Sequence, residues 1–217
     1  GEGFGFDNRA MFQYNRDWSA LEQLNFNYRK NGWDLSGMLY GSRMYGWIRK
    51  ELVQDTYLQE HWQQKSTTFN DWTSKNFNAR LAVNYTFNEH SALGIRYDYH
   101  KTPYSNALMG TNTDVYRDGA LSEKTYSPNI IDNGSEYHQV NAYYNGRIKD
   151  WSIDLNLDGY WDKSDKESYL DEKTELADGS ENSRYVSIFN DIDNTLYAAR
   201  LILSRTLWGG ELSFGGE

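Results

Sequence analysis

Hydrophobic and polar residues alternate along several stretches of the chain, which is typical of β-strands with two unlike faces. Two such stretches cover residues 77–87 and 92–100, and only Asn88-Glu89-His90 separates their ends. Two more cover residues 138–148 and 151–162, with Lys149-Asp150 between them. Because a very short connection joins the members of each pair, the sequence predicts two antiparallel hairpins.

Two further hairpins are predicted from the same pattern. Residues 23–29 and 33–42 flank Asn31-Gly32, a dipeptide typical of tight hairpin turns. Residues 197–203 and 212–214 flank Gly209-Gly210. The sequence therefore predicts about eight strands, arranged as four hairpins.

Long polar stretches separate these hairpins, over residues 50–72, 102–136 and 163–193, and we expect them to be loops. Both prolines, Pro103 and Pro128, lie in the second stretch. Loops longer than about 12 to 15 residues are uncommon in compact soluble domains. Tight turns at one end of a sheet and long loops at the other are typical of outer-membrane barrels. We therefore expect an all-β fold over residues 1–217, an antiparallel up-and-down meander that forms part or all of a transmembrane β-barrel.

The two faces of this expected sheet differ in polarity. The apolar face should hold Leu81, Val83, Leu93, Ile95, Leu155 and Leu157, and the polar face should hold Arg80, Arg96, Asp154 and Asp158. Aromatic residues flank the tight turns, namely Tyr28, Trp33, Tyr85, Phe87, Trp151 and Trp208. Such rings form girdles at membrane interfaces, although aromatic residues are also good strand formers wherever they occur.

Composition narrows the classes that the chain can belong to. The 217 residues carry a net charge of -9 and are 16% aromatic, so neither disorder nor sequence-independent nucleic-acid binding is expected. Without cysteine, the chain has no disulfide and no thiolate metal site. Acidic residues concentrate between Asp162 and Asp193, where ten stand against four basic residues. No apolar run approaches the roughly 18 residues of a membrane-spanning helix, and residues 1–10 do not have the pattern of a secretory signal.

Two segments resemble units of a known family. Residues 24–35, with the sequence LNFNYRKNGWDL, and residues 208–217, with the sequence WGGELSFGGE, are similar to the strand, turn and strand units of outer-membrane β-barrels related to TonB-dependent receptors. In that family a barrel of about 22 strands surrounds a plug domain. The resemblance implies a non-catalytic role in nutrient uptake in the cell outer membrane, with lipid, a plug domain and TonB as partners. Because no plug-like or TonB-contacting segment and no final strand ending in an aromatic residue is present, the chain is interpreted as a segment from the middle of a barrel.

Candidate chemical groups are few. His61, His90, His100 and His138 have neither the i,i+4 spacing nor the thiolate partners of a metal site, and we interpret them as surface or lumen residues. Residues 162–167 lack the ligand spacing of a calcium loop and are interpreted as part of a solvated acidic loop. The glycines of residues 1–5 precede no helix that could bind phosphate. We therefore predict no catalytic residue, metal or cofactor, and the substrate-binding residues stay unknown.

Two observations keep other functions open. Asp154 and Asp158 could be a hydrolytic pair, although any strand with an acidic face produces such pairs. Aromatic residues in the long connections could stack on a sugar or hold the loops in place: Trp62, Tyr104, Tyr116, Tyr126 and Tyr169. The alternatives to a transporter segment are a soluble carbohydrate-binding β-sandwich and a self-contained eight-stranded barrel, acting as an adhesin or a lipid-active enzyme. Because strands hold shape while long connections meet ligands, we expect the last two connections, over residues 102–136 and 163–193, to lie at one outer rim.

Overall fold

The chain forms one antiparallel sheet in a computed structural model, which describes residues 2–217 apart from the side chain of Tyr104. Nine strands follow one another in the sheet in the order of the sequence. They are β1 (Gly3–Asn15), β2 (Asp17–Lys30), β3 (Trp33–Tyr57), β4 (His61–Asn88), β5 (Ser91–Arg117), β6 (Ala120–Ile148), β7 (Trp151–Leu176), β8 (Glu181–Leu207) and β9 (Gly210–Gly216). The predicted all-β antiparallel meander is thus confirmed.

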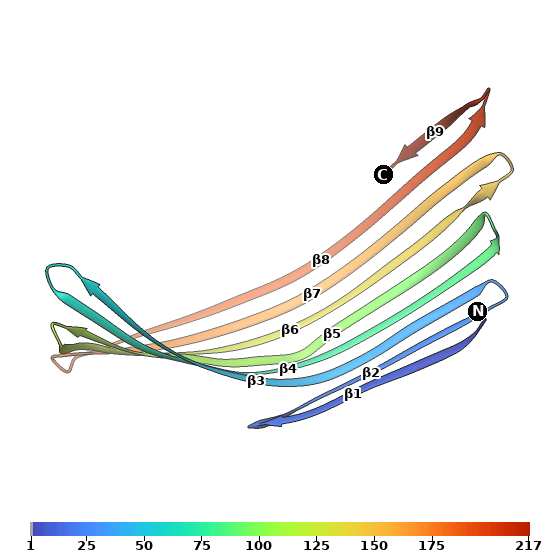
Figure 1. Cartoon of the computed structure of the whole chain (residues 1–217). Coiled ribbons are helices and arrows are strands. Elements are labelled where there is room, and N and C mark those ends of the chain that lie inside the picture. Colours follow the sequence, from blue (N-terminus) through green and yellow to red (C-terminus); the bar gives the residue numbers. More distant parts are fainter. Residues whose placement is uncertain (1) are drawn as a thin grey trace.

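The predicted tight turns share one end of the sheet. The turns that join β2 to β3, β4 to β5, β6 to β7 and β8 to β9 lie together at the upper right of Figure 1. The last of these turns consists of Trp208 and Gly209, one residue before the predicted pair, and both have positive φ angles. Asn31-Gly32 likewise has positive φ angles at both positions, as a two-residue hairpin turn requires.

The structure has nine strands and not eight, because β1 precedes the eight predicted strands. This strand pairs with β2 over its full length, and the chain reverses between them at Arg16, which has a φ of 64°. One face of β1, the face it shares with Tyr28, Phe26 and Leu24 of β2, carries Phe4, Phe6, Asn8, Ala10 and Phe12. Asn8 and Ala10 interrupt the run of aromatic residues, so the two faces of the strand differ little in polarity at its middle. That weak alternation explains why the strand was not recognised.

The three long connections predicted as loops are strands. Residues 50–57 continue β3, residues 61–72 begin β4, and the other two stretches form the outer halves of β5, β6, β7 and β8. The chain reverses at residues 58–60, at Asp118-Gly119 and around Asp178-Gly179. These outer hairpins, at the left of Figure 1, extend beyond the shorter β1–β2 hairpin.

Hydroxyl groups explain why such polar segments pair as strands. On the outer hairpins, Ser66 and Thr113 approach to 3.0 Å between their hydroxyl oxygens, and Thr68 and Thr111 approach to 3.1 Å. Thr125 and Thr174 repeat this contact on β6 and β7 at 3.0 Å. Cross-strand hydroxyl pairs of this kind stabilise sheets without apolar burial. A period-two search for hydrophobic residues therefore does not detect them.

One irregularity interrupts the long strands. Between Thr102 and Ser105, β5 carries one residue more than either β4 or β6, which is a β-bulge that contains Pro103. A proline suits this position because it has no N–H to donate to a ladder. Pro128 lies within β6, where the paired register with β7 is interrupted between Tyr126 and Asn129. Both prolines thus lie where ladder pairing is locally interrupted or distorted.

The sheet has no second layer over either face. Among the described residues, no hydrophobic side chain is buried, and Figure 1 shows a single curved sheet. The strand order places β1 and β9 at its two edges. The described chain is therefore one sheet and not the two packed sheets of the sandwich alternative. The same part of the chain contains no helix with the length and apolarity to cross a membrane.

Candidate functional site

The pairing register assigns each side chain to one of two faces. Residues directly opposite in neighbouring strands point to the same side of a sheet. Val83 lies opposite Ile95, which lies opposite Ala142, which in turn lies opposite Leu157. Leu81, Leu93 and Leu155 belong to the same face by the same pairings. Arg80, Arg96, Asp154 and Asp158 occupy the other face, so the predicted division between the faces is confirmed.

The apolar face forms a bounded area, which we call the apolar window. Near the tight turns it ends in aromatic rings, where Trp33 and Tyr85 lie 4.6 Å apart between ring centroids and Tyr85 and Phe87 lie 4.9 Å apart. Toward the outer hairpins it ends in a second set of rings. These are Trp18 on β2, Phe77 on β4, Tyr99 on β5, Trp161 on β7 and Tyr197 on β8.

A row of charges follows the second set of rings on four neighbouring strands. Lys101 lies opposite Glu136, Glu136 lies opposite Lys163, and Lys163 lies opposite Asp193. The signs alternate, and the Lys101 ammonium is 2.8 Å from the Glu136 carboxylate. The Lys163 ammonium lies 3.3 Å from Asp193. This charged row separates the apolar window from the outer halves of β5 to β8. Through Phe77 and Gly41 the row continues to Glu22 on β2, which lies inward of Trp18 and accepts a hydrogen bond from Asn8.

The polarity of the two faces changes beyond the charged row. The face that carries the apolar window continues into charged residues, such as Asp165, Glu167, Asp171 and Lys173 on β7. The opposite face continues mainly into uncharged residues, including Thr111 and Thr113 on β5 and Ile131 on β6. Each long strand thus presents a different pair of surfaces in its two halves.

We call the part of the strands between the tight turns and the charged row the inner half. Its polar face contains a hydrogen-bonded cluster of two arginines and one aspartate. Arg80 donates from Nε to Oδ1 of Asp98 at 2.5 Å, and Arg96 donates from Nε to Oδ2 at 2.5 Å. Arg96 also donates from Nη2 to Oδ1 at 3.2 Å. The side chain of Asp98 is only 13% exposed, whereas both arginine side chains are about half exposed. The sequence predicted Arg80 and Arg96 on one face, but only the register reveals that the carboxylate of Asp98 serves both cations.

The two proposed hydrolytic carboxylates are held by separate partners. Asp154 accepts a hydrogen bond from Arg200 at 3.3 Å. Asp158 accepts hydrogen bonds from the side-chain amides of Asn141 and Asn156, both at 2.7 Å. The two residues are four positions apart on one strand, which separates their backbones by roughly 13 Å. That spacing exceeds the carboxyl separation of glycosidase pairs, so the geometry does not favour a hydrolytic pair.

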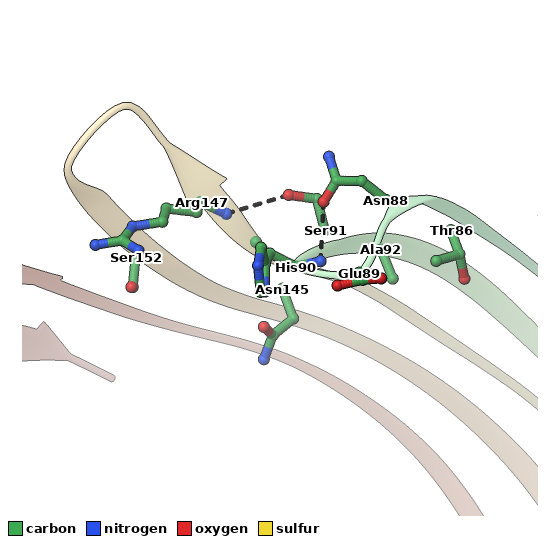
Figure 2. A pocket seen from close by; sticks show the side chains of 10 residues that line it. Thr86, Asn88, Glu89, His90, Ser91, Ala92, Asn145, Arg147 and Ser152 are labelled. Atoms are coloured by element: carbon green, nitrogen blue, oxygen red, sulfur yellow. Dashed lines mark hydrogen bonds between the residues drawn. The ribbon is translucent and has the colours of Figure 1, made fainter.

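A polar pocket of about 470 Å³ lies on the polar face beside two tight turns, as Figure 2 shows. Residues of β4 to β7 and of the turn between β4 and β5 line it, among them Asn88, His90, Arg147 and Ser152. The backbone N–H of His90 donates to Oδ1 of Asn88 at 2.9 Å, and the backbone N–H of Arg147 donates to Oγ of Ser91 at 3.2 Å. Both side-chain oxygens therefore stabilise the backbone around the turns, which assigns them a structural role.

The histidines do not gather at one place. His90 lies in a tight turn and His100 and His138 lie on strands, as predicted. His61 was predicted in a loop, but it is the first residue of β4, and its ring stacks on Tyr57 at 4.7 Å between centroids. Within the described residues, no group of three or more potential ligands could hold a metal ion.

Two sequence motifs need correction. Residues 162–167 were interpreted as part of an acidic loop, but they lie in β7 and pair with both β6 and β8. Trp62, Tyr116, Tyr126 and Tyr169 were expected on loops and lie on strands. In the glycine-containing segment of residues 1–5, Gly3 and Gly5 belong to β1. Gly1 and the side chain of Tyr104 lie outside the described residues.

The tips of two outer hairpins are joined to each other. The backbone N–H of His61 donates to the Asp118 carboxylate at 2.9 Å, and the backbone N–H of Asp118 donates to the carbonyl of His61 at 2.8 Å. Arg117 pairs with Glu60, which raises the pKa of the guanidinium. His61 also pairs with Asp55 at 2.8 Å. The β3–β4 and β5–β6 hairpins therefore form one unit at their tips.

No family model matches the chain, and no curated protein shows significant similarity to it.

Proposed function

We propose that the chain is part of an outer-membrane β-barrel transporter that resembles TonB-dependent receptors and acts in nutrient uptake without catalysis. In this proposal the apolar window faces lipid, the polar face lines the interior, and the outer hairpins project from the membrane. Its partners are outer-membrane lipid and, in the whole protein, a plug domain and TonB. The free edges at β1 and at β8–β9 would pair with further strands to close the barrel.

The observation that carries this proposal concerns the second set of rings, which marks the outer boundary of the apolar window. The position of this boundary along the strands shifts from β2 to β8. Trp18 on β2 lies four residues beyond the Glu22 row on the outer side, whereas Tyr197 on β8 lies four residues from Asp193 on the inner side. Glu22 and Asp193 belong to one continuous row across the sheet. The boundary therefore shifts by eight residues over the six steps from β2 to β8.

This slope has the size that a tilted barrel requires. A shift of about 1.3 residues per strand is roughly 4.5 Å along the strand for each 4.8 Å across the sheet, which corresponds to a tilt of roughly 43°. Strands of membrane barrels tilt by about 35–45°. If the strands tilt by this angle, Trp18 and Tyr197 come to one height, and the rings of Phe77, Tyr99 and Trp161 lie within about two residues of that height. The same tilt is not needed in a sheet whose aromatic residues only favour strand formation.

The charges outside the window support the same orientation. Lipid excludes charged side chains, and the charged row lies one same-face position outside Tyr99 on β5 and Trp161 on β7, and two outside Tyr197 on β8. Soluble monomers rarely expose contiguous apolar patches larger than about a few hundred Å², and the exposed leucine, isoleucine and aromatic residues of the apolar window are spread over many strands. A lipid contact would account both for the apolar window and for the charged row that lies outside it on β5 to β8.

Single cysteine reporters test this proposal, since the chain has no native cysteine. Val83→Cys lies in the apolar window, and Ala82→Cys is its neighbour on the polar face with a similar partial exposure. In phospholipid vesicles, a water-soluble maleimide should label the Ala82→Cys variant and leave the Val83→Cys variant unlabelled. After solubilisation in urea, both should react.

The opposite pattern would reject the lipid-facing assignment. Equal labelling of both variants in vesicles means that the apolar face meets water. A monodisperse, detergent-free monomer that protects only Val83→Cys supports a soluble protein instead. Deleting either of two outer hairpins, over residues 102–136 or 163–193, from the full-length parent should weaken uptake while leaving membrane assembly intact.

A further inference from the structure

We propose that Arg80 and Arg96 form a binding site for an oxyanion, either a carboxylate or a phosphate, on the polar face of the sheet. The inference requires the pairing of β4 with β5 and does not depend on the lipid-facing role of the opposite face. It concerns a small area in the inner half of these two strands. No hydrolysis or transfer step is involved.

The charge balance of the cluster is the first argument. Two guanidinium groups share the single carboxylate of Asp98, so one positive charge is left without a local counter-charge. The residues that flank the cluster by register are uncharged: Met38 and Gln139 beside Arg80 and Asp98, and Ala82 and Asn141 beside Arg96. The adjacent position on β5, His100, is engaged with Asn78.

The other described carboxylates on this face make no direct contact with the two arginines. By register the next one is Asp158, which lies beyond Asn141 on β7. Its two oxygens already accept hydrogen bonds from Asn141 and Asn156. An amide-bound carboxylate two strands away provides Arg96 with no direct partner. Asp98 is therefore the one carboxylate in contact with the two guanidinium groups within the described residues, and a bound anion could contact both directly.

The arrangement of donors is the second argument. Arg80 contacts Asp98 through Nε alone, and Arg96 uses Nε and Nη2. Within the described chain, the two terminal nitrogens of Arg80 and Nη1 of Arg96 donate to no protein acceptor. Asp98 is nearly buried and fixes the Nε end of both guanidinium groups, while the arginine side chains are about half exposed. Their free donors can therefore bind a planar or tetrahedral oxyanion without first being ordered.

Another ion pair on the same face differs from the cluster in its charge balance. Arg29 pairs with Asp34 near the tight turns, and there one cation faces one carboxylate. That pair has no excess charge. If general attraction to arginine were enough for binding, both places would bind anions. If the shared carboxylate matters, only the Arg80–Arg96 cluster will do so.

The test uses the 217-residue chain in the detergent or buffer that keeps it monodisperse. With ¹⁵N-labelled arginine, the Nε–H signals are followed by NMR while sodium phosphate is added at constant ionic strength. The signals of Arg80 and Arg96 should shift and saturate, and the signal of Arg29 should not. The Arg80→Gln and Arg96→Gln variants should each bind phosphate roughly tenfold more weakly, or worse, since each removes charge-assisted hydrogen bonds.

A second set of variants keeps the test decisive if a glutamine variant does not fold. Arg80→Lys and Arg96→Lys keep the charge but lose the forked donors, so binding should weaken while the circular dichroism of the sheet stays unchanged. The matched control Arg29→Gln should leave phosphate binding unchanged. Absence of saturable shifts in the folded wild type, or binding that persists in the folded Arg80→Gln/Arg96→Gln variant, would overturn the site.

A parallel titration separates the two sources of oxyanion. A hexaglutamate peptide is compared with acetate at equal carboxylate concentration. Tighter binding of the peptide supports a site for an acidic polypeptide segment. Equal binding of acetate, peptide and phosphate supports a site for small free anions. Both outcomes require the same two arginines, whereas saturable shifts confined to Arg29 would contradict the proposal.

Discussion

The inner and outer halves of the long strands use the same backbone pairing but present opposite surfaces. In the inner half, one face carries leucine, valine and aromatic residues, and the other carries Arg80, Arg96 and Asp98. In the outer half, the first face becomes charged, and the second carries hydroxyl, amide and aliphatic groups. The charged row from Lys101 to Asp193 marks the change on β5 to β8.

This difference teaches that strand pairing and facial polarity are separate properties. Ladder hydrogen bonds are made by the backbone, so β4 pairs with β5 in both halves despite the change in side chains. The polarity of a face reflects what the face contacts. A single strand can therefore pass from one environment into another without a break in its ladder.

The largest expected effect is the cost in folding free energy of an introduced arginine, which should differ between the inner and outer halves. Leu81 in the inner half and Leu108 in the outer half lie on the same side and are similarly exposed, at 46% and 41%. In phospholipid bilayers, Leu81→Arg should destabilise folding by about 2–4 kcal/mol, because lipid excludes the guanidinium. Leu108→Arg should cost less than about 0.5 kcal/mol, because water solvates it. Urea titrations in vesicles measure both values, and equal costs would remove the distinction.

The next effect compares two acidic residues that differ in burial. Asp98 has a side chain that is 13% exposed and accepts bonds from two arginines, whereas Asp193 in the charged row is 66% exposed. Asp98→Asn should cost about 1.5–3 kcal/mol of unfolding free energy, because it weakens bonds to two charged groups. Asp193→Asn should cost about 0–1 kcal/mol. Denaturant titration distinguishes these ranges, and a neutral Asp98→Asn variant would contradict the role of the shared carboxylate.

A third comparison concerns glycines within the inner half. A Cβ atom at Gly37 would lie 2.2 Å from the ring of Phe26, whereas a Cβ at Gly41, on the same face of β3, would meet no atom within 4 Å. Gly37→Ala should therefore destabilise the sheet by about 1–3 kcal/mol, and Gly41→Ala should stay within about 1 kcal/mol of wild type. Thermal or urea unfolding of both variants tests this. Equal costs would show that Phe26 moves away without penalty.

The smallest effect is expected at the tips of the outer hairpins. The hydrogen bond from His61, followed by that from Gln63, holds the pKa of Asp55 below its ordinary value of 3.8. The Asp55 contribution is therefore present above pH 3.8 and is lost as the pH falls through the lower pKa of the folded protein. Amide hydrogen exchange at residues 55–63 should increase over that acidic range. Asp55→Asn should abolish this dependence, and a measured Asp55 pKa above 3.8 would contradict it.

Sequence patterns predicted the inner half well because one face there is strongly apolar. Residues 77–87 and 151–162 alternate over many positions, and their turns were placed correctly or within one residue. The outer half was missed because it has no such contrast, although Asp118-Gly119 and Asp178-Gly179 are recognised turn signals. These two dipeptides could have shown that the supposed loops were hairpins.

The Arg80–Asp98–Arg96 cluster was beyond sequence reasoning for a different reason. Alternation shows that the three residues share a face, but it does not give the alignment of β4 against β5. That alignment depends on the length of the Asn88–His90 turn and on the bulge near its end, where the register shifts between Thr86 and Asn88. A shift of two residues would preserve the faces and still remove the contact between Arg80 and Asp98.

The extra residue of β5 near Pro103 makes this strand sensitive to changes in length. Deleting one residue between Thr102 and Ser105 would restore uninterrupted alternation and turn every later side chain of β5 to the opposite face. Leu108 and Asp114 would exchange sides with Met109 and Thr113. Single insertions or deletions should therefore be tolerated at the hairpin tips and selected against within β5, unless a second length change nearby restores the phase.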